Sequence, residues 1–166
     1  MIKMLRIDER LIHGQVAVVW SKVLHITHIL VANDDVMNND TQQMSMKMAV
    51  PDNIKFLCRN VSDSISLLKK PQAQQLAMFV VVQNFKDAKK IGQELQKQIE
   101  VINVGNYGLL PINQHGTQQR KIDSAVQVDE ADLSEIKAIA QLSPNFVSQL
   151  TPDAKTKNLK KIYGGE

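Results

Sequence analysis

The sequence predicts a single α/β domain with a Rossmann-like fold, a mainly parallel sheet of about six to seven strands with helices on both faces. Two observations carry this prediction. Short β-branched segments alternate with helix-compatible segments along all 166 residues. Residues 76–82 are apolar at every position, which is typical of a central strand buried on both faces of a parallel sheet. The length fits one domain with a core of its own.

Seven strands are expected, each short and bounded by polar or turn-forming residues. They cover residues 2–8, 28–33, 54–58, 76–82, 100–104, 125–128 and 146–150. Five helices are expected between them, at 15–22, 41–49, 62–69, 87–98 and 130–141. The last two have clear start signals, because Asn84 and Asp129 stand where a helix-capping side chain is needed. Residues 1–166 are read as one domain, with 152–166 as a partly ordered, Lys-rich tail.

Composition excludes several classes of protein. The 20 basic and 17 acidic residues leave a formal charge of only +3, too little to indicate nucleic-acid binding. Arg6 and Asp8 interrupt the stretch where an export signal needs apolar residues. The run 76–82 is far shorter than the ~20 residues of a membrane-spanning helix, so a cytoplasmic location is expected. Cys58 is the single cysteine, which excludes an intrachain disulfide and favours a buried, inert thiol.

The densest polar segment lies directly after the first strand, where open parallel sheets bind their ligands. It contains Asp8, Arg10, His13, Gly14 and Gln15 in a loop that leads into a helix. The amides of a helix N-terminus attract phosphate, and Gly14 allows close approach of the backbone. Arg10 suits bidentate binding of phosphoryl oxygens, and Asp8 suits orientation of Arg10 or of the imidazole. From spacing alone, however, a histidine here is more often a capping or packing residue.

Other candidate sites are less specific. His25 and His28 form a pair without further ligands, whereas structural zinc requires four, so no metal is expected. Asp34 and Asp35 follow the second strand and leave open a magnesium-dependent receiver-like domain phosphorylated on aspartate. His115 lies in a polar loop and has no assigned role. Neither a Walker loop nor a dinucleotide-binding glycine motif occurs, so no nucleotide cofactor is indicated.

Residues 6–16, RIDERLIHGQV, resemble the RIDDRLIHGQV signature of the mannose/fructose/sorbose family of phosphotransferase system IIB components. The segments 29–36, 49–51, 103–105 and 125–129 also resemble that family, in consistent order. The resemblance implies that His13 accepts a phosphoryl group on Nδ1 from a IIA domain. It then passes the group to a sugar that enters through the IIC/IID membrane permease. Arg10 would contact the phosphoryl group and Asp8 would support the site, without cofactor or metal.

The chain departs from the family pattern after Gly105, where Asn106 replaces a second glycine and a longer loop follows. Gly105 and Asn106, with Gly14 and Gln15, are expected to line the phosphate site, and the role of the 106–121 loop is open. An exposed apolar rim for docking is expected near residues 11–12. A peripheral position at the permease is implied, whereas the sugar and homodimerisation stay undecided. The alternative from another class is a non-catalytic Rossmann-like regulatory or binding module.

Overall fold

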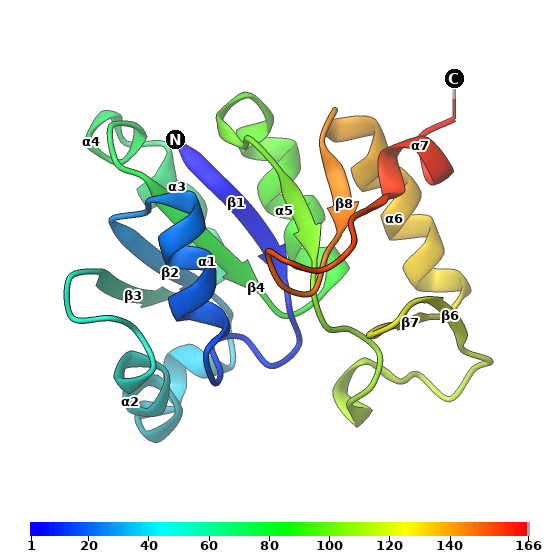
Figure 1. The fold of residues 1–166 in the computed structure, drawn as a ribbon, viewed down its shortest axis with the longest axis horizontal. Coiled ribbons are helices and arrows are strands. Elements are labelled where there is room, and N and C mark those ends of the chain that lie inside the picture. The colour runs from blue at the N-terminus through cyan, green and yellow to red at the C-terminus, as the bar shows by residue number, and fades with distance from the viewer. Residues whose placement is uncertain (166) are drawn as a thin grey trace.

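The computed structural model describes residues 1–165 and contains the predicted open α/β sheet (Figure 1). The strand order is β3-β2-β4-β1-β5-β8-β9. The first six of these strands are parallel, and β9 is antiparallel to β8. Their bounds are Lys55–Arg59 (β3), His28–Ala32 (β2), Met78–Val82 (β4), Ile2–Ile7 (β1), Ile102–Val104 (β5), Phe146–Ser148 (β8) and Lys157–Asn158 (β9). The predicted fold class is confirmed.

Helices cover both faces of the sheet, because alternate residues of each inner strand point to opposite sides. On one face, Phe79 and Val81 pack in a cluster that includes Trp20. On the other face, Val80 and Val82 belong to the larger core cluster. The first face carries α1 (Val16–Leu24) and α2 (Asp40–Met48), and the second carries α3 (Val61–Leu68), α5 (Phe85–Leu95) and α6 (Glu130–Leu142). The shorter helices are η1 (Val36–Asn38), α4 (Pro71–Gln74), η2 (Gln96–Gln98), η3 (Pro111–Asn113) and α7 (Leu159–Tyr163).

Strand β4 confirms the predicted central strand, which was expected at residues 76–82. All five of its residues are buried, and it lies between β2 and β1 inside the sheet. The expected strand at 125–128 differs in its pairing. As β7 (Val126–Val128) it forms a separate antiparallel pair with β6 (Arg120–Asp123), outside the main sheet. The sequence did not predict β6, because its two leading residues are exposed and charged and give no apolar run.

The C-terminal segment also contributes to the fold. After β8 the chain passes in front of β5, then forms β9 and α7, where Leu159 is fully buried (Figure 1). Residue 166, the end of the expected tail, lies outside the described residues. Among residues 1–165, no helix combines the length and the apolar character needed to span a bilayer.

Candidate functional site

The loop 8–15 joins β1 to α1 at the carboxyl edge of the sheet, the lower edge in Figure 1. Two residues with positive φ give it its shape, Leu11 at 58° and Gly14 at 51°. The amide of Leu11 donates to the Asp8 carbonyl at 2.9 Å. Leu11 and Ile12 are only 1% and 7% exposed and pack in the core on the α1 face. The predicted exposed rim near these two residues is therefore wrong, because their burial is what fixes the strained loop.

His13 is held between solvent and a buried carboxylate. Its side chain is 28% exposed, and its Nε2 lies 3.5 Å from Oδ2 of the fully buried Asp8. The Nε2 atom itself is inaccessible and makes no hydrogen bond among the described residues. The other oxygen of Asp8 accepts the backbone amide of Arg10 at 3.0 Å. This arrangement turns Nε2 toward the protein and leaves Nδ1 as the ring nitrogen for a reaction partner.

Arg6 supports Asp8 from behind. This arginine is 1% exposed, and its Nε and Nη2 lie 3.4 and 3.3 Å from Asp8 Oδ2. Its remaining donors bind the carbonyls of Gln149 and Leu150 at 3.2 and 2.9 Å. The guanidinium also lies over the Trp20 ring, 5.5 Å from its centroid. A buried cation is thus neutralised and hydrogen-bonded, which is the condition for keeping it in the core.

The protonation state of Asp8 follows from these neighbours. Burial by itself raises the pKa of a carboxyl group, because it disfavours the charged form. The His13 ring nearby, the charge of Arg6 and the hydrogen bonds from the Arg10 amide and the Asn106 side chain outweigh burial and lower the pKa of Asp8. Asp8 is therefore a carboxylate at neutral pH. It can accept a hydrogen bond from Nε2 of His13 when that nitrogen carries the proton.

Gly105 and Asn106, expected at the phosphate, lie behind Asp8. Asn106 is 7% exposed, and its Nδ2 donates to Asp8 Oδ2 at 3.1 Å. A Cβ at Gly105 would overlap the Arg6 guanidinium and lie 2.9 Å from its Nε. The departure from the family pattern at Asn106 thus supplies one more donor to the buried carboxylate, and Gly105 makes room for the arginine.

The other three expected residues face solvent. Arg10 is exposed, and among residues 1–165 no hydrogen bond or ion pair involves its guanidinium. A Cβ at Gly14 would meet nothing within 4 Å. Gln15 occupies the N-cap of α1 without a capping hydrogen bond, and the first turn of α1 has no acidic residue. In contrast, α2, α3, α5 and α6 all have a capping Asn or Asp and an acidic first turn. The α1 N-terminus therefore keeps its affinity for an anion.

Glu9 has a place beside the site that the sequence pattern did not predict. It is 2% exposed, and its Oε1 accepts the amide of Gly108 at 2.9 Å and Nδ2 of Asn113 at 3.1 Å. Its Oε2 accepts the amides of Leu109 and Leu110, both at 3.0 Å. The sequence did contain a hint of this contact. Glu9 replaces the shorter Asp of the family signature, and the loop that Glu9 binds is the other main departure of this chain from the family pattern.

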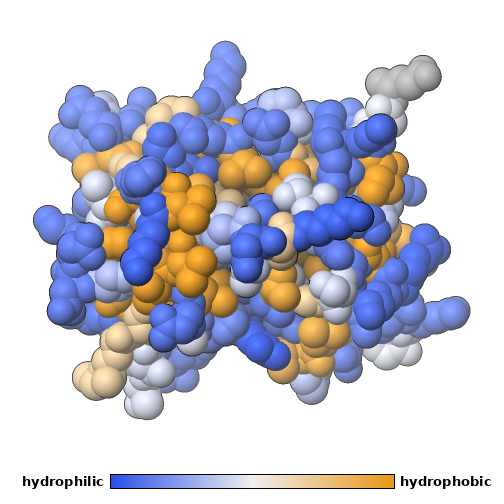
Figure 2. Space-filling view, in the orientation of Figure 1, coloured by the Kyte–Doolittle hydropathy of each residue, from blue (hydrophilic) through white to orange (hydrophobic). Residues whose placement is uncertain are grey.

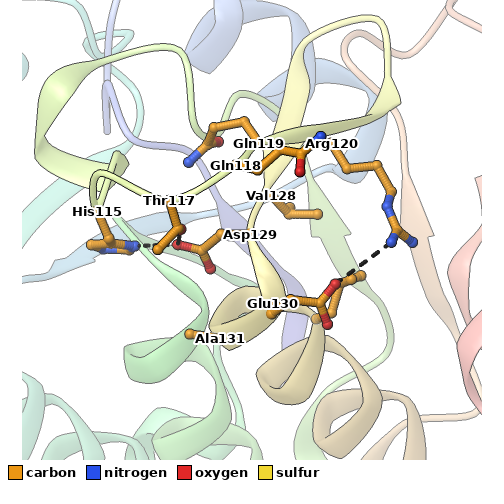
Figure 3. A pocket seen from close by; sticks show the side chains of 10 residues that line it. His115, Thr117, Gln118, Gln119, Arg120, Val128, Asp129, Glu130 and Ala131 are labelled. Atoms are coloured by element: carbon orange, nitrogen blue, oxygen red, sulfur yellow. Dashed lines mark hydrogen bonds and ion pairs between the residues drawn. The ribbon is translucent and has the colours of Figure 1, made fainter.

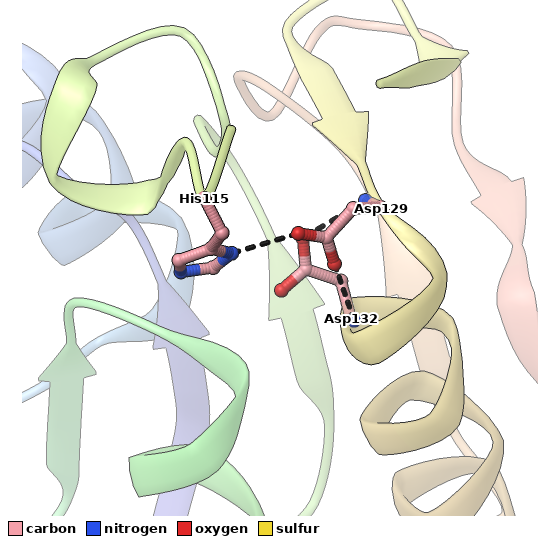
Figure 4. Close-up of side chains that lie close together, drawn as sticks. All are labelled: His115, Asp129 and Asp132. Carbon is pink, nitrogen blue, oxygen red and sulfur yellow. Dashed lines mark hydrogen bonds and ion pairs between the residues drawn. The ribbon is translucent and has the colours of Figure 1, made fainter. Parts of the chain in front are cut away.

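A second cluster lies at the start of α6 (Figure 4). His115 Nδ1 lies 2.7 Å from Asp129 Oδ2, which also accepts the Thr117 hydroxyl at 3.2 Å. The other oxygen of Asp129 and Oδ2 of Asp132 form a reciprocal capping box, and Asp132 Oδ1 accepts the Tyr107 hydroxyl at 2.6 Å. The ligand atoms of His115, Asp129 and Asp132 lie within 4.8 Å of one another, as a metal site requires. All four carboxylate oxygens already accept hydrogen bonds, so the cluster is explained as a clamp on the loop.

Beside this clamp is a pocket of about 450 Å³, lined by residues 115, 117–120, 128–131 and 133 and not by His13 (Figure 3). An ion pair between Arg120 Nη2 and Glu130 Oε1, 3.6 Å long, crosses its rim. Both partners are largely exposed, so the pair adds little stability. The pocket lies between residues 115–120 and the start of α6, and His13 is not among the residues that line it.

The alternative acidic site after β2 has a structural explanation. Asp34 Oδ1 accepts the amide of Val61 at 2.9 Å, at the start of α3. The Asn33 side chain accepts the amides of Asp35 and Val36 and so closes the turn after β2. Of the two carboxylates, Asp34 thus fixes the entry of a neighbouring helix, and this does not favour an aspartyl-phosphate site.

Comparison with known proteins agrees with the geometry. The family model for "PTS system sorbose subfamily IIB component" matches residues 2–166. A probable phosphotransferase enzyme IIB component of Streptococcus pyogenes is 47% identical over 108 residues, 65% of this chain and 66% of that protein. The mannose-specific EIIAB component of Escherichia coli is 27% identical over 97% of this chain, which spans only 48% of that relative. The crystal structure of the IIBSor domain of the Klebsiella pneumoniae sorbose permease has the same fold, with TM-score 0.83, 24% identity, and coverage of 97% and 94% of the two chains.

Proposed function

The chain belongs to the sorbose subfamily of phosphotransferase system IIB components, and we propose that His13 is the residue that carries its phosphoryl group. Membership in the family makes the chain a phosphoryl-transfer component of a sugar phosphotransferase system. A non-catalytic binding module is not favoured. The observation that carries the assignment to His13 is the contact of its Nε2 with the buried carboxylate of Asp8.

This contact supports a defined chemical role for each ring nitrogen. With the proton on Nε2 and facing Asp8, the lone pair of Nδ1 is free to attack phosphorus in line. The new bond joins Nδ1 to phosphorus, and the bond from phosphorus to the donor imidazole breaks with its electron pair returning to the donor nitrogen. The positive charge that develops on the His13 ring is stabilised by Asp8. The 3.5 Å separation is long for a hydrogen bond, and we expect it to shorten when charge develops.

The exposed groups around His13 suit the oxygens of the phosphoryl group. Among residues 1–165 the Arg10 guanidinium has no hydrogen bond or ion pair, and the N-terminus of α1 at Gln15 offers backbone amides without a side-chain cap. Gly14 leaves open space on the same side. Gly105 and Asn106 act indirectly, by shaping the Arg6 and Asp8 support. Asp8 is thus proposed as a supporting residue, and Arg10 as the direct phosphoryl ligand.

The partners follow from the family. The donor is a IIA domain bearing a phosphohistidine, and the acceptor is a sugar bound by a IIC/IID permease, at which this chain docks from the cytoplasmic side. The name EIIAB of the mannose-specific relative is consistent with a IIA and a IIB domain in one chain, because this chain spans about half of it. Relatives are named for sorbose and for mannose, and the sugar of this chain is left open.

The test is the intact mass of the protein after incubation with a phosphorylated IIA domain. Wild type is expected to gain one phosphoryl group that is lost in acid and kept in alkali, as phosphohistidine requires. His13→Gln is expected to gain none. A gain that survives acid but is lost in alkali would indicate an aspartyl phosphate and refute the assignment. Phosphorylation of the His13→Gln variant would place the carrier elsewhere, and His115→Gln is the matched control for loss of a histidine.

A further inference from the structure

The buried side chain of Glu9 ties the loop 108–113 to the histidine site. We propose that Glu9 is a positioning residue that holds this loop as a fixed rim of the site, on which Leu109 and Ile112 contact and select the phosphoryl donor. The proposal rests on the proposed function and deepens it, since it names the part of the chain that recognises the IIA partner.

The carboxylate of Glu9 organises the loop as an anion inside a nest of amides. It accepts three consecutive backbone N–H groups, from residues 108 to 110, and the Asn113 side chain. Among the ion pairs of the described residues none includes Glu9, so these four donors are its compensation in the core. An uncompensated buried carboxylate is costly, so the loop and Glu9 are fixed together.

Contacts other than those of Glu9 also fasten the loop. Gly108 has φ of 82°, and a Cβ there would overlap the carbonyl of Gln127, so the chain passes tightly against β7. Gln114 Nε2 returns to the Gly108 carbonyl at 3.0 Å. Beyond it, His115 is clamped to Asp129. A loop tied at both ends is a rigid platform rather than a mobile segment.

This platform presents apolar side chains at the edge that a donor must cover. Leu109 and Ile112 are 38% and 54% exposed. Glu9, which binds the loop, is the neighbour of Asp8 in the chain, and Figure 1 shows the loop on the same edge as the segment between β1 and α1. Figure 2 shows hydrophobic atoms at this lower edge. A protein that delivers a phosphoryl group to His13 in line covers this edge, and exposed apolar groups there are suited to contact.

Charge favours the donor over the permease as the occupant. Residues 106–121 contain two basic residues, Arg120 and Lys121, and no Asp or Glu. Cytoplasmic loops of membrane proteins carry an excess of Lys and Arg, so a permease would meet the like charge of Lys121 close to the platform, whereas Arg120 is paired with Glu130. The lengthened loop therefore fits a IIA domain better.

The experiment measures initial rates of His13 phosphorylation against the concentration of phosphorylated IIA domain. The variants are Glu9→Gln and the double variant Leu109→Ser/Ile112→Ser. The control is Ile162→Ser, since Ile162 is equally exposed, 52%, and lies on α7 at the opposite edge (Figure 1). We expect KM for the donor to rise about fivefold or more in both variants while kcat stays within about twofold, as loss of a docking contact predicts. Hydrogen exchange at the amides 108–110 is expected to accelerate in Glu9→Gln only.

Several results would overturn the inference. One is an unchanged KM for the donor in the Leu109→Ser/Ile112→Ser variant, and another is an equal rise of this KM in the Ile162→Ser control. A third is a defect of the double variant that is confined to phosphoryl transfer from this protein to the sugar at the permease. Unchanged exchange at 108–110 in Glu9→Gln would refute the positioning role even if docking were affected. Failure of wild type to accept any phosphoryl group would instead refute the proposed function, and the inference with it.

Discussion

Replacing Asp8 by asparagine tests the centre of the site with almost no change in shape. Asp8 Oδ2 accepts from Arg6 and Asn106 and lies 3.5 Å from His13 Nε2, and Asp8 Oδ1 accepts the Arg10 amide. An amide has only one acceptor oxygen. Whichever way the new side chain is turned, its NH₂ group faces a donor, and the buried guanidinium of Arg6 loses its counter-charge.

The expected cost in stability is large. Arg6 is 1% exposed and Asp8 is its one ionic partner among the described residues. Breaking a buried ion pair on one side typically costs about 3–5 kcal/mol, because the other charge stays buried. The carbonyls of Gln149 and Leu150 still accept from Arg6, so we expect the lower part of that range.

The expected cost in activity comes from the orientation of His13. A hydrogen bond to a charged group contributes about 1.5–3 kcal/mol, so its loss in the transition state slows phosphorylation by about 10- to 150-fold.

The pH dependence of stability should also change. The native pKa of Asp8 is lowered, so in wild type its contribution is present above the unfolded pKa of about 3.9 and is lost as pH falls through the native value. The variant lacks this acid-dependent loss.

Two measurements check these expectations. Urea unfolding at neutral and at acid pH gives the free energy of unfolding, and rapid quenching with phosphorylated IIA domain gives the single-turnover rate. Asp8→Glu is a second variant that keeps the charge and shifts the carboxylate, so it should retain more stability than activity. An Asp8→Asn protein that is destabilised by less than about 1 kcal/mol and phosphorylated at the wild-type rate would show that Asp8 neither neutralises Arg6 nor orients His13.

Three further predictions concern neighbouring features. Gly105→Ala should displace the Arg6 guanidinium, destabilise the protein by about 1–3 kcal/mol in urea unfolding and slow phosphorylation; an unshifted unfolding midpoint would contradict this packing. The hydrogen bond with Asp129 raises the pKa of His115, so the stability lost in His115→Gln, at most about 1 kcal/mol, should be largest below about pH 6.5 and vanish as pH rises through the native pKa; a loss that does not vary with pH in urea unfolding would contradict this. Burial raises the pKa of Cys58, so thiol reagents should label it slowly in the native protein and rapidly in urea, and fast native labelling would show it accessible.

The position of the candidate site was predictable because it depends on local sequence. The segment 8–15 follows a strand and precedes a helix, and this order alone places its polar residues at the carboxyl edge of a parallel sheet. The apolar run at β4 likewise indicated a central strand, because burial on both faces requires apolar side chains at every position. Helix starts at Asn84 and Asp129 were readable from their capping side chains.

The support of the site was not predictable, because its partners are far apart in the chain. Arg6 looks like a polar interruption of an apolar strand until the fold brings the carbonyls of residues 149–150 to it. Glu9 meets amides a hundred residues away, and its role depends on where the 108–113 loop passes.

Leu11 and Ile12 also show that burial in a loop cannot be predicted from the local sequence. As apolar residues beside a reactive histidine they suggested a docking surface, and the fold buries them instead. The fold class and the candidate reactive histidine could be predicted from the sequence, since both follow from short-range order along the chain. Which charges are buried, which apolar groups stay exposed and what holds His13 depend on the folded chain, because burial and long-range hydrogen bonding arise only when distant segments pack together.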